Sequence, residues 1–116
     1  MPMRLITEEI RAALITNGRR FQRDPDFDPL PLVKLFTPDA AATWLIAAAD
    51  PEDPDLLFGL CDLGVGFPEL GSVLLSEIQS VRGRLGLRVE RDLTFKADRS
   101  ISAYAKVATA ASRIVA

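Results

Sequence analysis

Two charged residues interrupt apolar strand patterns in this chain. Asp62 lies near the end of the apolar run 56–63 and is followed by a glycine-rich turn. Arg91 lies on the otherwise apolar face of the predicted strand 88–96. Each charge requires a partner, because burying an unpaired charge is costly. The structural interpretation is a partly buried Asp62–Arg91 ion pair, or an Asp62 carboxylate that accepts backbone N–H groups of the turn that follows it.

The functional alternative is a pocket with Asp62 and Arg91 as its polar floor and Glu69 and Trp44 at its edge. A carboxylate-dependent hydrolase would then use Asp62 and Glu69. The chain contains no histidine, which is the commonest general base and metal ligand. Its one cysteine, Cys61, lies in an apolar run, as is typical of a small buried side chain. The sequence therefore assigns no catalytic residue, cofactor or metal, and favours a non-enzymatic protein.

A basic patch with an interleaved aromatic residue is the second candidate site, because this combination suits phosphate contact and base stacking. Its residues are Arg19, Arg20, Arg23 and Lys34, with Phe21 among them. Three aspartates follow within residues 24–28 and would cancel much of the positive field. The whole chain has 14 basic and 16 acidic residues, a net charge of −2, which argues against non-specific binding of nucleic acid. Nucleic acid is kept as an alternative partner.

Two further motifs are interpreted as turns. The acidic group 50–55 contains four carboxylates, but their spacing does not match a calcium-binding loop, and Asp and Pro are the residues that turns prefer. The glycines at 64, 66 and 71 do not have the spacing of a phosphate-binding loop.

The elements that position these residues alternate in type along the chain. Thr7 is expected to cap a helix that ends at Gly18. A proline-rich ordered loop over 19–31 follows. Strands are predicted at 32–36, 43–49, 56–63, 70–75 and 88–96, with a short helix opened by Ser76 and an alanine-rich helix after residues 98–100.

Short connections between strands predict antiparallel neighbours, since a parallel crossover needs a dozen residues or more. The fold class is therefore α+β: a small antiparallel sheet of four to five strands, with N-terminal, short middle and C-terminal helices packed on one face. The 116 residues, 48% of them hydrophobic, are expected to form one domain over 1–116. The start of the chain has no apolar signal-peptide core and no stretch is long enough to span a membrane, so the expected location is the cytoplasm.

The segments 31–40, 43–45, 53–55, 58–64 and 66–71 resemble a bacterial family, domain of unknown function 2958, over roughly residues 4–105. The resemblance implies no activity and no catalytic residue. It implies an accessory protein of bacterial plasmids and integrated elements. The leading hypothesis is an interaction or regulatory module with an unidentified protein partner. Because small residues permit close approach, the C-terminal helix is also a candidate homodimer seam.

Overall fold

The computed structural model describes residues 4–116 and contains five strands and three helices within them. The elements are α1 (Glu8–Arg23), β1 (Val33–Phe36), β2 (Thr43–Ala49), β3 (Leu56–Asp62), β4 (Glu69–Leu74), α2 (Leu75–Ser80), β5 (Glu90–Arg91) and α3 (Ile101–Ala111). All strand pairs are antiparallel and the sheet order is β4-β3-β2-β1-β5. The predicted α+β class with an antiparallel sheet and three helices is confirmed.

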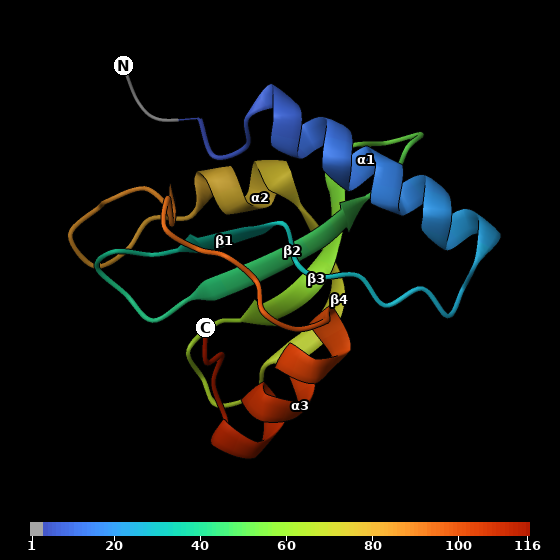
Figure 1. Ribbon diagram of the computed structural model, residues 1–116. Coiled ribbons are helices and arrows are strands. Elements are labelled where there is room, and N and C mark those ends of the chain that lie inside the picture. The colour runs from blue at the N-terminus through green and yellow to red at the C-terminus, as the bar shows by residue number, and fades with distance from the viewer. Residues whose placement is uncertain (1–3) are drawn as a thin grey trace.

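The sequence predicted that the three helices pack on one face of the sheet. In the structure they lie on both faces (Figure 1). Strand β2 explains the difference, since every residue from Trp44 to Ala49 is buried and successive side chains point to opposite faces. Its apolar residues therefore need a cover on each side. Helices α1 and α2 cover one face, which is called the α1 face here; α3 covers the other, the α3 face, where its Ile101, Tyr104 and Ala108 pack with Leu45, Ala47 and Leu60.

Helix α1 begins where the sequence predicted but ends five residues later. The Thr7 side chain accepts a hydrogen bond from the Ile10 N–H at 3.2 Å. The helix passes through Gly18 and continues to Arg23, so residues 19–23 of the predicted loop are helical. Gly18 is required by packing rather than by a helix end, because a side-chain carbon there would collide with the carbonyl of Ala49 on β2.

Other element boundaries also differ from the prediction. Strand β5 has two residues instead of nine, because the chain turns at once: the Asp92 carboxylate accepts a hydrogen bond from the Thr94 N–H at 2.9 Å. Helix α2 has no side-chain cap; Ser76 donates its hydroxyl to Asp55 at 2.7 Å instead. Ser100 caps α3, as the sequence indicated. No helix within residues 4–116 is both long and apolar enough to cross a membrane.

Candidate binding cleft and sheet edge

Asp62 is buried, with 3% of its surface exposed, and both carboxylate oxygens accept backbone hydrogen bonds. Oδ1 accepts the Gly64 N–H at 2.8 Å, and Oδ2 accepts the Ile114 N–H at 2.9 Å. The carboxylate thus holds the turn after β3 and the segment after α3, which form a small hollow next to it. Of the two structural interpretations, the structure shows the bond to the following turn, and the bond to Ile114 was not anticipated.

Arg91, Glu69 and Trp44 do not join Asp62, because the pleat of the sheet sends them to the other face. Asp62 lies opposite Thr43, whereas Trp44 and Glu69 both lie opposite Cys61, the next residue along the strand. Leu35 of β1 lies opposite Trp44 on one side and opposite Arg91 on the other. Arg91 therefore shares the α1 face with Trp44 and Glu69. The Asp62–Arg91 ion pair and the four-residue pocket are therefore absent.

Arg91 instead secures the start of the described chain. Its Nη1 donates to the carbonyl oxygens of Arg4 at 2.7 Å and Leu5 at 3.0 Å. These bonds tie the segment before α1 to strand β5. The role of Arg91 in this arrangement is structural.

The predicted basic patch is divided between the two faces of the sheet. Lys34 lies opposite Leu45, and so on the α3 face, away from α1. Its ammonium lies 3.6 Å from an Asp92 carboxylate oxygen and donates to the Ala116 carbonyl oxygen at 2.9 Å. The three arginines are all on α1, and the Arg20 guanidinium stacks on the Phe27 ring at 4.1 Å. Only the arginines therefore stay together as an exposed group.

The acidic segment 50–55 forms the turn between β2 and β3, as expected. Asp50 accepts a hydrogen bond from the Glu52 N–H at 2.9 Å, and Asp55 accepts one from the Ser76 N–H at 3.0 Å. No group of three or more potential metal ligands forms within residues 4–116. Cys61 is half-buried on the α1 face, and burial raises the pKa of its thiol.

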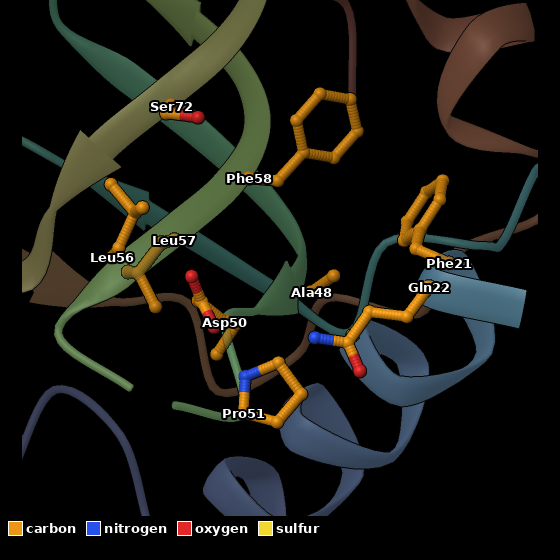
Figure 2. A pocket seen from close by; sticks show the side chains of 11 residues that line it. Phe21, Gln22, Ala48, Asp50, Pro51, Leu56, Leu57, Phe58 and Ser72 are labelled. Carbon is orange, nitrogen blue, oxygen red and sulfur yellow. The ribbon is translucent and has the colours of Figure 1, made fainter. Parts of the chain in front are cut away.

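An apolar cleft opens between the end of α1 and strands β2 to β4 (Figure 2). Its aromatic walls are Phe21 and Phe58, whose ring centroids lie 5.5 Å apart in an edge-to-face arrangement. Ala48 and Pro51 also line it, and its volume is about 290 Å³. This volume lies at the lower end of the roughly 300–1,000 Å³ of small-molecule pockets. The cleft therefore has the capacity for one large side chain or a small ligand.

Three polar side chains border this apolar cleft: Asp50, Gln22 and Ser72 (Figure 2). Asp50 uses one carboxylate oxygen in its turn, and its other oxygen has no hydrogen-bond partner within residues 4–116. Ser72 belongs to β4 and lies directly opposite Phe58. An apolar lining with a few polar groups is the usual composition of a binding site.

Strand β4 is an open edge of the sheet. Within the described chain it pairs with β3 alone, while the opposite edge is extended by β5. Natural edge strands are usually protected by lysine, proline or a covering element. Glu69–Leu74 contains neither residue, and the space around Gly71 is open. The backbone of β4 is therefore available to pair with another chain.

The loop between β3 and β4 carries large apolar side chains into solvent. The exposed fractions are 65% for Leu63, 69% for Val65 and 77% for Phe67. Gly64 and Gly66 have positive φ angles of 81° and 93°, a conformation that glycine adopts without strain. The backbone therefore fixes a tight turn that directs its apolar residues outward. This group is called the apolar loop below.

A family model described as "Protein of unknown function (DUF2958)" matches residues 5–115 of the chain. The chain belongs to this family. No curated protein and no solved structure matches it. The DUF2958 assignment covers the cleft, the β4 edge and the apolar loop, and it attaches no chemistry to any of them.

For this DUF2958 chain, sequence reasoning does not reveal the cleft or the open edge. The apolar loop contains the pair Phe67-Pro68, and an apolar pair at a loop tip more often packs inward than binds a partner. In the structure Pro68 is buried and Phe67 is exposed. The cleft could not be found from spacing, because Phe21, Asp50 and Ser72 come from three separated elements. The absence of lysine and proline from strand β4 was the available sign of an unprotected edge.

Proposed function

We propose that this chain is a non-enzymatic protein-interaction module of a bacterial mobile element, and that it binds its partner through the β3–β4 hairpin. The observation that carries the proposal is the apolar loop, in which Leu63, Val65 and Phe67 are each at least 65% exposed. Grouped exposed apolar residues are typical of interaction sites, whereas single ones are common on any surface.

The same hairpin carries two further binding features. Its second strand, β4, begins at the loop and is the open edge of the sheet, and Ser72, farther along that strand, borders the apolar cleft toward the other end of the hairpin. One partner could therefore contact side chains at the loop and backbone along the strand. Phe67 is the expected anchor, since aromatic residues are enriched among the residues that dominate binding energy.

The two alternative functions receive less support from the geometry. A hydrolase that uses Asp62 and Glu69 needs carboxylates that converge, but these two lie on opposite faces and Asp62 is bonded to two backbone N–H groups. A nucleic-acid interface would rest on the three α1 arginines without Lys34. The homodimer through α3 remains a prediction.

The experiment compares partner capture from a lysate of the bacterial host by the unchanged protein and two variants. Phe67→Ser removes the most exposed residue of the apolar loop. Leu85→Ser is the matched control, because Leu85 is 80% exposed but lies in a different loop. We expect Phe67→Ser to lose a partner, identified by mass spectrometry, that Leu85→Ser retains. Equal capture by both variants would contradict the proposal.

A further inference from the structure

We infer that the segment of the partner that binds this module is extended and basic, that it joins the sheet beside β4, and that it places one apolar side chain in the cleft. This inference rests on the proposed function and specifies the chemistry of the partner.

The backbone of β4 supplies the first argument. The strand Glu69–Leu74 offers six residues of edge, with no neighbour on the outer side in the described chain. An extended segment that pairs there satisfies the N–H and C=O groups that the edge leaves to solvent. Such strand addition fixes the backbone path of the bound segment, so alternate side chains point to one face of the sheet.

The cleft supplies the second argument, because it borders the edge strand. Ser72 lies on β4 and lines the cleft, and Phe58, its direct neighbour on β3, forms one wall. A segment paired with β4 at this level therefore carries a side chain toward the cleft. The volume of about 290 Å³ and the aromatic walls suit a single large apolar side chain.

Charge determines which occupant is favoured. Asp50 borders the cleft, Glu69 begins β4, and Asp55 accepts a hydrogen bond from the Ser76 N–H just beyond the other end of β4. An antiparallel second copy would place the Glu69 end of one strand against the Asp55 end of the other, so like charges would meet. A basic segment paired with β4 meets carboxylates near both ends of the strand and at the cleft, whereas the exposed arginines belong to α1, which packs against β2. We therefore commit to a basic partner segment rather than to self-association.

The probe is a fluorescently labelled hexapeptide with blocked ends that alternates lysine with apolar residues, one of them phenylalanine. Its matched control replaces each lysine with glutamate. Titrations followed by fluorescence anisotropy at low salt compare the two peptides. We expect the lysine peptide to bind about tenfold or more tightly, because several weak charge pairs change sign together. No binding of the lysine peptide, or equal binding of both peptides, would overturn the inference.

Two variants test whether the peptide occupies the β4 edge. Ser72→Lys adds a cation to the edge strand, and Ala12→Lys adds the same charge to an exposed position on α1. We expect Ser72→Lys alone to weaken binding of the lysine peptide, while urea unfolding shows that both variants remain folded. Equal affinities of these two variants would place the peptide elsewhere and overturn the inference.

Hydrogen exchange followed by NMR gives the backbone evidence. At a peptide concentration about ten times the Kd, exchange of the outward-facing amides of residues 69–74 should slow about tenfold. Unchanged exchange at these amides with bound peptide would overturn strand addition, and protection without peptide in a dimer would favour self-pairing. The two experiments distinguish this inference from the proposed function. If Phe67→Ser loses the captured partner while the lysine peptide fails to bind, the proposed function is supported and this inference is wrong.

Discussion

Replacing Asp62 with alanine tests how the end of the chain is held to the sheet. The Asp62 carboxylate accepts the N–H of Gly64 at 2.8 Å and the N–H of Ile114 at 2.9 Å. The second bond joins residues 52 positions apart in the sequence. Loss of this carboxylate therefore releases both the turn after β3 and the segment after α3.

The expected cost follows from how well water can replace each bond. A hydrogen bond to a charged group contributes about 1.5–3 kcal/mol, and a buried donor left without a partner costs a similar amount. Ile114 is 8% exposed, so its N–H is poorly placed to find water, whereas Gly64 is exposed. We therefore expect Asp62→Ala to lower the free energy of unfolding by about 2–4 kcal/mol, mostly through Ile114.

Urea unfolding followed by circular dichroism measures this loss. For a small domain the expected decrease corresponds to a fall of about 1–2 M in the urea midpoint. The urea midpoint of Asp62→Asn should lie between those of the unchanged protein and Asp62→Ala, because the amide oxygen accepts one bond but the amide nitrogen accepts none. Asp53→Ala is the control, since Asp53 is exposed and its side chain makes no hydrogen bond within residues 4–116. If Asp62→Ala and Asp53→Ala have the same midpoint, the carboxylate does not hold the two segments.

Three further predictions concern packing and titration. Gly18→Ala should lower the free energy of unfolding despite the better helix propensity of alanine, because the new carbon meets a β2 carbonyl. Gly71→Ala is the control and should be tolerated, since the space around Gly71 is open; the urea midpoints of the two variants are compared. Iodoacetamide should alkylate Cys61 more slowly in the folded protein than in urea, with a rate that rises toward high pH, because burial raises the thiol pKa. Hydrogen bonding from Ser102 lowers the pKa of Asp28. This carboxylate therefore stabilises the fold above about pH 4, and its contribution is lost as the pH falls through the lowered pKa. Ser102→Ala should make acid unfolding less steep.

The sequence predicted features that depend on local chemistry. The Thr7 and Ser100 caps, the antiparallel connections and the acidic turn each follow from residues that lie close together in the chain. Gly18 shows the limit of such reasoning, because the same residue suits a helix end or a close contact, and only the position of β2 distinguishes the two. Helix length depended on packing between distant elements.

The error over Asp62 and Arg91 has a simple geometric cause. Both residues are charged interruptions of apolar patterns, but which face each occupies depends on register between strands. A shift of one residue sends a side chain to the other face. The pairing of Leu35 with both Trp44 and Arg91 places Arg91 on the α1 face, and no composition argument contains that information.

The two edges of the sheet are unequal because of where the chain goes after β4. Helix α2 follows β4 directly, and the chain then returns along the opposite edge as β5, which pairs with Leu35 and Phe36 of β1. That edge gains a neighbour, and Arg91 ties it further to the residues before α1. Helix α3 later packs against β4, but within residues 4–116 no strand other than β3 pairs with it. The connection that adds the two-residue β5 to one edge thus leaves the six-residue β4 as the longer open edge beside the apolar cleft, and this strand is the one on which a partner strand can add.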